Sequence, residues 1–126
     1  NPIRLVIDKD LKLSKNLNLF NSESETIIFN KIKSDNLSKN NYIKISFNNM
    51  INNILKELYK QKNQSVIVEG GTTTLQSFID ENIWDEARIF TTDTKLENGV
   101  KSPIIKGKKI SETEIDTDYL KIILND

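Results

Sequence analysis

Residues 65–79 read SVIVEGGTTTLQSFI, and this stretch decides the fold class. The β-branched run from Ser65 to Glu69 predicts a strand, which Gly70-Gly71 ends. Apolar residues then recur at helical spacing, which predicts a helix from about Thr73 to near Asn82. Because a strand that leads directly into a helix is typical of α/β proteins, we assign the chain to that class.

The turn between this strand and helix has the components of an anion site. Two glycines allow the backbone to approach a ligand closely, and the first N–H groups of a helix attract phosphate. The hydroxyls of Thr72, Thr73 and Thr74 would add donors or cap the helix. The alternative is a plain tight turn, and spacing alone does not separate the two. The stretch matches neither GxxxxGK[ST] nor GxGxxG.

Glu69 stands at the predicted carboxyl end of the strand, where ligands of α/β sheets bind. Its carboxylate could accept hydrogen bonds from hydroxyl or amine groups of a ligand. A solvated strand terminus is an equally good interpretation of its position.

The other elements follow from apolar patterning. The run Ile3 to Ile7 predicts a strand buried on both faces. An apolar stripe from Phe47 to Tyr59 predicts a helix, which Ser46 or Asn48 could cap. The remaining expectations are strands at 26–29, 42–45, 86–92 and 119–124, and loops at 10–24, 30–41 and most of 93–118, including a solvated loop at Lys106–Lys109.

The predicted order is therefore three strands, a helix, a strand, a helix and two strands. The strand–helix–strand units in the middle predict a parallel portion, and the two closing strands predict an antiparallel edge. No internal repeat or domain boundary is evident, so residues 1–126 form one unit in this interpretation. Trp84 is interpreted as a packing residue of a turn.

Composition excludes several functions. The chain has 18 acidic and 18 basic residues and neither histidine nor cysteine. Ser-His-Asp or Cys-His catalysis, disulfides and Cys-ligated zinc are therefore excluded. Zero net charge argues against nucleic acid or an anionic membrane as a partner. Neither a long apolar run nor a signal-peptide pattern is present, which favours a cytoplasmic protein.

Three stretches together resemble the C-terminal reductase domain of the bifunctional riboflavin biosynthesis protein of the RibD type. They are PIRLVID at 2–8, SVIVEGG at 65–71 and TTLQSFIDENIWDEARIF at 73–90. Trp84-Asp85-Glu86 stands where the family has a VDE turn. The stretches occur in the family's order at plausible separations, and the resemblance covers roughly residues 2–105.

The resemblance implies a dihydrofolate reductase-like three-layer α/β sandwich with a mixed, mostly parallel sheet. It implies NADPH as cofactor and reduction of the ribose of 5-amino-6-(5-phosphoribosylamino)uracil, a phosphoribosyl-pyrimidine, to the ribityl form. Glu69 would contact the substrate. Lys9 would contact the cofactor through its backbone. The turn and helix start would bind the cofactor through Gly70, Gly71, Thr72, Thr73, Thr74, Leu75, Gln76 and Ser77.

The chain also departs from the family pattern. The first strands of the reductase domain, which precede the 2–8 stretch in the family, are absent, and residues 91–99 lack the usual proline- and glycine-containing segment. The zinc deaminase domain is absent too, since its His and Cys ligands do not occur here.

We therefore expect a piece excised from a longer protein, with little or no activity alone. Unpaired strand edges predict a homodimer or larger assembly. The alternatives are a non-catalytic dimerising half-domain and a dihydrofolate reductase-like enzyme.

Overall fold

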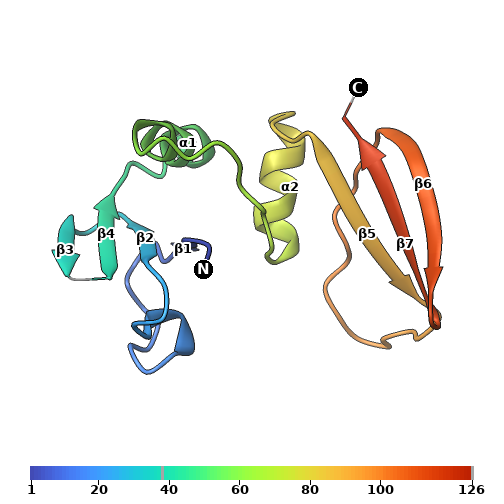
Figure 1. Ribbon diagram of the computed structural model, residues 1–126, viewed down its shortest axis with the longest axis horizontal. Coiled ribbons are helices and arrows are strands. Elements are labelled where there is room, and N and C mark those ends of the chain that lie inside the picture. Colours follow the sequence, from blue (N-terminus) through green and yellow to red (C-terminus); the bar gives the residue numbers. More distant parts are fainter. Residues whose placement is uncertain (38, 126) are drawn as a thin grey trace. The chain divides into compact units, whose positions relative to one another are not determined.

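The computed structural model describes residues 1–37 and 39–125. The chain folds as two compact units, Asn1–Ser65 (unit 1) and Val66–Asp126 (unit 2), each with its own sheet and helix (Figure 1). The boundary between the units falls inside the segment for which the sequence predicts a strand.

Unit 1 has a four-stranded, mostly parallel sheet in the order β1-β2-β4-β3. β2 runs parallel to both β1 and β4, whereas β3 pairs with β4 in the antiparallel direction. A helix, α1, follows the sheet in the chain. The bounds are β1 Arg4–Ile7, the short 3₁₀ helix Asn18–Phe20, β2 Thr26–Asn30, β3 Asp35–Leu37, β4 Asn40–Lys44 and α1 Met50–Lys60.

The core of unit 1 lies around β2, because this strand has a neighbour on each edge. Ile27, Ile28 and Phe29 are completely buried. α1 buries Ile51, Ile54 and Leu58, whose spacing of three and four residues forms one apolar face, as the sequence predicts. Unit 1 is thus organised by one apolar strand and one amphipathic helix.

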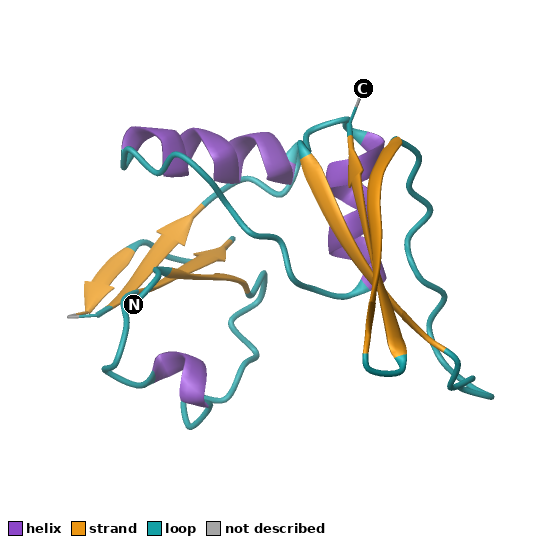
Figure 2. Cartoon of the chain, turned by 45° about the vertical axis from the view of Figure 1, so that its right-hand side comes forward, coloured by secondary structure: helices purple, strands orange, loops and turns teal. Residues whose placement is uncertain are grey.

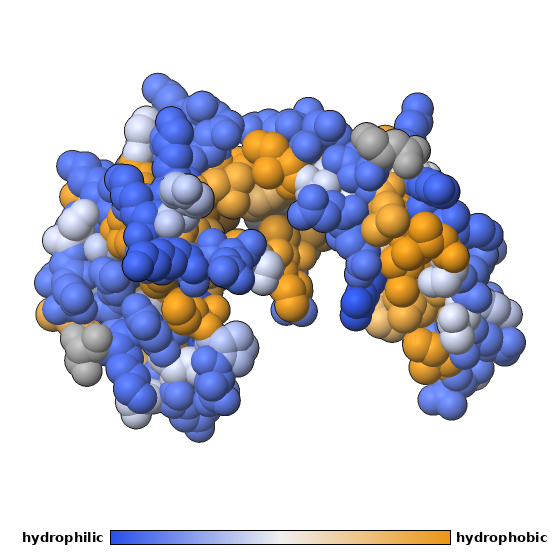
Figure 3. All heavy atoms as spheres, turned by 45° about the horizontal axis from the view of Figure 1, so that its top comes forward, coloured by the Kyte–Doolittle hydropathy of each residue, from blue (hydrophilic) through white to orange (hydrophobic). Residues whose placement is uncertain are grey.

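Unit 2 has one helix, α2 (Thr72–Asp80), and a three-stranded antiparallel sheet in the order β5-β7-β6. The strands are β5 Glu86–Thr92, β6 Lys108–Ile115 and β7 Asp118–Leu124. A long loop connects β5 to β6 (Figure 2). Ile123 of β7 is buried, whereas Phe90 of β5 is exposed. The space-filling view shows hydrophobic atoms on the surface of the molecule (Figure 3).

These elements confirm the α/β class and the antiparallel end of the chain. They correct the predicted strand at Ser65–Glu69, since residues 63–71 are not part of any strand or helix. A strand requires a hydrogen-bonded neighbour, and this segment has none among the described residues; the side chain of Ile67 is 85% exposed. The parallel pairs belong instead to β1, β2 and β4, which loops and β3 connect.

Other expectations fail where polar residues form strands. The predicted loops at 30–41 and 93–118 contain β3 and β6, and Lys108 and Lys109 of the predicted solvated loop open β6. β1, expected to be buried on both faces, is only half buried because it lies at a sheet edge: Ile7 is 37% exposed, and Ile3 just before the strand is 41% exposed.

The predicted helix caps are also wrong. α1 begins after Asn49, whose backbone is left-handed (φ 59°), rather than after Ser46 or Asn48. α2 begins after Gly71, and no side chain caps it. Both helix starts are therefore set by the backbone rather than by a capping side chain. None of the described helices has the length and apolarity that a bilayer crossing would require.

Candidate functional site

The candidate site is the start of α2 and the glycine turn before it, all within unit 2. The carbonyl of Gly71 accepts hydrogen bonds from the N–H groups of Thr74 (3.1 Å) and Leu75 (3.2 Å), which closes the first helical turn. The N–H groups of Gly71, Thr72 and Thr73 donate to no described residue. They remain free for an anion at the positive end of the helix.

The two glycines keep this helix start open. A Cβ atom on Gly71 would have no neighbouring atom within 4 Å, and one on Gly70 would meet only Thr74, at 3.6 Å. Gly71 has an extended backbone (φ −66°, ψ 163°) that other residues adopt readily. The fold therefore does not need glycine at position 71, and its missing side chain leaves room at the helix start.

The polar side chains of the helix start divide into two groups. The hydroxyls of Thr73 and Thr74 bond to no described residue. The hydroxyl of Ser77 donates to the carbonyl of Thr73 one turn earlier (2.8 Å). Thr72 and Gln76 instead bond to the long β5–β6 loop. The hydroxyls of Thr73 and Thr74 are therefore the ones available to a ligand without rearrangement.

Glu69 precedes this turn in the chain and is exposed. Its carboxylate forms no ion pair or hydrogen bond with any described residue. The carboxylate is therefore available to a ligand, although the strand expected to hold it is not formed.

Lys9 belongs to unit 1, whereas the other candidate residues belong to unit 2. Its carbonyl accepts a hydrogen bond from the N–H of Lys31 (3.0 Å), and its ammonium group lies 5.6 Å from the ring centroid of Phe47. The lysine side chain and carbonyl are thus engaged, and its backbone N–H is the group left for a ligand.

Asp8 fixes the backbone that follows β1. Its carboxylate is largely buried and accepts hydrogen bonds from the N–H groups of Lys12 (2.9 Å) and Leu13 (3.1 Å). Its carbonyl accepts another from Leu11. Asp8 therefore holds the chain in a tight turn that includes Lys9.

We expect Asp8→Ala to lower the free energy of unfolding by about 1 kcal/mol, because both carboxylate hydrogen bonds are lost. Asp10→Ala is the matched control, since Asp10 forms a surface ion pair with Lys31 (2.7 Å), which contributes little to stability. Urea denaturation followed by circular dichroism measures both variants. Equal midpoints for the two variants would contradict the role of Asp8.

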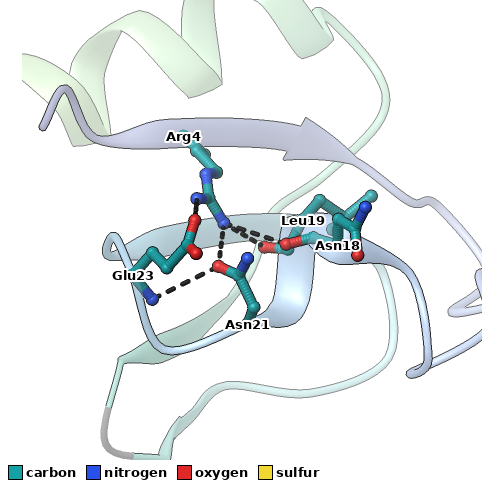
Figure 4. A pocket seen from close by; sticks show the side chains of 5 residues that line it. All are labelled: Arg4, Asn18, Leu19, Asn21 and Glu23. Atoms are coloured by element: carbon teal, nitrogen blue, oxygen red, sulfur yellow. Dashed lines mark hydrogen bonds and ion pairs between the residues drawn. The ribbon is translucent and has the colours of Figure 1, made fainter.

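Arg4 is a further polar centre, which the sequence analysis did not single out. Its guanidinium donates to the carbonyls of Asn18 (3.1 Å) and Leu19 (3.3 Å) and to the side chain of Asn21 (2.7 Å), and pairs with Glu23 at 3.7 Å (Figure 4). These residues line a polar hollow of about 460 Å³. Since the chain's own groups occupy the guanidinium, Arg4 holds the 10–24 loop on the sheet. In the sequence, the feature that could have indicated this role is a single arginine within an otherwise apolar strand.

Two carboxyl groups have lowered pKa values. A hydrogen bond from Lys31 lowers the pKa of Asp10, and a hydrogen bond from Lys109 lowers the pKa of Glu112. Both are exposed surface pairs, and none of their residues is a candidate site residue, so neither contributes a tuned acid or base to the candidate site.

The elements and the open glycine turn define an α/β protein with a candidate anion site at the start of a helix. Within that class, residues 1–114 match the family described as RibD C-terminal domain, and the chain belongs to this family.

A curated relative agrees with this family. The chain is 27% identical over 119 residues to the riboflavin biosynthesis protein RibD of Aquifex aeolicus, covering 89% of this chain and 33% of that protein. The chain therefore spans about a third of the length of this curated relative.

Solved structures show the same fold. A diaminohydroxyphosphoribosylaminopyrimidine deaminase/5-amino-6-(5-phosphoribosylamino)uracil reductase of Thermotoga maritima superposes with a TM-score of 0.83 at 20% identity, over 100% of this chain and 38% of that one. The riboflavin biosynthesis reductase of Saccharomyces cerevisiae gives 0.76 at 17% identity, over 99% and 70%. The chain thus has the dihydrofolate reductase-like fold of these reductases, as the family resemblance implies.

Proposed function

We propose that the chain is part of an NADPH-dependent reductase of riboflavin biosynthesis. The parent protein would reduce the ribose of 5-amino-6-(5-phosphoribosylamino)uracil to the ribityl group. The family match over residues 1–114 carries this proposal. The open helix start supports it, because unpaired N–H groups and an uncovered glycine suit the phosphate of a nucleotide.

The cofactor and the chain would have separate roles in the reaction. NADPH supplies the hydride, and the protein binds and orients the reactants. The N–H groups of residues 71–73 would hold a phosphate of the cofactor, with the free hydroxyls of Thr73 and Thr74 beside them. Glu69 would accept hydrogen bonds from the substrate.

We further propose that residues 1–126 are a partial reductase domain of a cytoplasmic protein. The chain spans 70% of the yeast reductase, so the rest of that protein has no counterpart here. The outer edge of β1 has no neighbouring strand among the described residues, and Ile7 of β1 and Ile3 just before the strand are exposed. Such an edge favours pairing with a second copy, and therefore a homodimer or larger assembly. A clean monomer in sedimentation at micromolar concentration would contradict the assembly.

Binding of NADPH tests the site. We expect Gly71→Ala to weaken binding at least about tenfold, because the added methyl group occupies the space through which a phosphate reaches the helix N–H groups. Stability should not fall, since the methyl group meets no protein atom within 4 Å. Isothermal titration calorimetry measures the affinity.

Gly99→Ala is the matched control for this variant, because its Cβ would also lie in open space and position 99 is outside the candidate site. Equal affinities of the two variants would place the cofactor elsewhere. A wild-type chain that does not bind NADPH would contradict the proposed cofactor site in this chain.

Hydride transfer by the isolated chain is expected to be very slow, because a partial domain presents only part of the substrate site. Oxidation of NADPH in the presence of the phosphoribosyl-pyrimidine measures it. Turnover comparable to that of an intact RibD-type reductase would show that residues 1–126 are sufficient.

A further inference from the structure

The long β5–β6 loop is fastened to α2 at two points. The hydroxyl of Thr72 donates to the carbonyl of Lys101 (2.6 Å). The side-chain amide of Gln76 donates to the carbonyl of Ile104 (3.2 Å) and accepts a hydrogen bond from its N–H (2.9 Å). Thr72 and Gln76 are four residues apart and therefore lie on one face of the helix. Residues 101–105, called the strap below, thus follow this face from its first turn.

The two attachments differ in strength. Gln76 binds both backbone groups of Ile104, as a neighbouring strand would, and its amide is itself held by Asp80 (2.8 Å). Pro103 and Ile105 on either side are half buried, although Ile104 is 75% exposed. Thr72 contributes a single hydrogen bond at the other end of the strap. The Gln76 attachment is therefore the firm one, and the Thr72 attachment is the one that can be exchanged.

The Thr72 hydroxyl has one proton to donate. In this structure it goes to the strap, whereas the neighbouring N–H groups of residues 71–73 donate to no described residue. A phosphate bound to these N–H groups would need the same proton for a bond to Thr72. Gln76, by contrast, already donates both amide N–H groups to Asp80 and Ile104, and its carbonyl oxygen accepts the N–H of Ile104.

We propose that the strap is a docked cover of α2, and that the strap and a bound nucleotide phosphate compete for the hydroxyl proton of Thr72. In this arrangement Gln76 is a positioning residue rather than a cofactor ligand. The competition rests on the proposed function, whereas docking of the strap does not. Nucleotide binding and attachment of the Lys101 end then oppose each other.

Gln76→Leu tests docking first, without nucleotide. We expect amide hydrogen exchange of Ile104 to accelerate about tenfold or more, because its N–H loses its acceptor. Gln76→Glu keeps an acceptor but loses the donor, and its exchange rate should fall between those of the wild type and Gln76→Leu. Gln61→Leu, an exposed substitution in unit 1, is the matched control and should leave Ile104 unchanged. Unchanged exchange of Ile104 in Gln76→Leu would overturn the docked strap.

NADPH affinity of the same variants tests the competition. We expect Gln76→Leu to bind NADPH about fivefold more tightly, because the released strap no longer competes for the Thr72 hydroxyl. This factor corresponds to about one hydrogen bond. Equal or weaker binding would overturn the competition and leave Gln76 as a supporting residue of the site. A wild-type chain without NADPH affinity would overturn both the competition and the proposed cofactor site in this chain, and the exchange measurement separates that outcome from loss of the strap.

Discussion

Replacing Gly107 with alanine is expected to destabilise unit 2 by about 3 kcal/mol, at the upper end of the usual cost of overpacking. A Cβ atom at this position would overlap the carbonyl oxygen of Leu124 and lie 2.9 Å from the ring of Trp84. The backbone of Leu124 cannot give way easily, because it belongs to the central strand of the sheet. The next residue, Asn125, is tied to the turn by bonds to Trp84 (2.8 Å) and Asp85 (2.9 Å).

The fluorescence of Trp84, the single tryptophan of the chain, follows this transition in a urea titration. Gly99→Ala serves again as the control, since its Cβ would have no atom within 4 Å. That variant should be neutral or slightly stabilising, because alanine restricts the unfolded chain. If Gly107→Ala and Gly99→Ala unfolded at the same urea concentration, the close approach of Gly107 to β7 would be wrong.

The elements that the sequence predicts well are those whose own residues carry the signal. β2 is apolar throughout its centre, and α1 repeats apolar residues at helical spacing, so local patterning identifies both. β6, in contrast, reads KKISETEI and has little apolar content. Its pairing with β7 forms it, including a bulge between Lys109 and Ser111, and pairing with a distant strand leaves no local pattern.

Ser65–Glu69 is the opposite case: the sequence predicts a strand that the structure does not contain. Its β-branched residues favour a strand, yet strand formation depends on a neighbour that supplies the ladder hydrogen bonds. The segment has no such neighbour among the described residues, so it does not form a strand despite its strand propensity. The β-branched run predicts a strand from local residues alone, and such a pattern does not supply the pairing partner.

The candidate site could be predicted only in part for a related reason. The glycine turn and helix start are contiguous in sequence, so their place at the start of α2 followed from local reasoning. The engagement of Thr72 and Gln76 did not, because their partners Lys101 and Ile104 lie 29 and 28 residues away along the chain. Long-range contacts thus decide which residues of the helix start are free for a ligand.

Phe29→Ala is expected to cost about 3–5 kcal/mol, the usual penalty for removing a fully buried phenylalanine. Phe29 lies on β2, opposite Ile7 of β1 and Ile43 of β4, so its loss leaves a cavity on the face of the sheet that these three side chains share. A unit of this size is stable by only about 3–10 kcal/mol, and the variant should therefore be largely unfolded in unit 1. Circular dichroism in a urea titration measures the loss.

Phe90→Ala is the matched control, because the Phe90 side chain is 65% exposed and leaves little or no cavity. It should change the free energy of unfolding by less than about 1 kcal/mol, as surface substitutions usually do. Because both variants remove the same atoms, the difference between their free energies of unfolding measures the effect of burial. If Phe29→Ala proved as mild as Phe90→Ala, β2 would not be the centre of the core, and the parallel pairing of β1 and β4 around it would have to be revised.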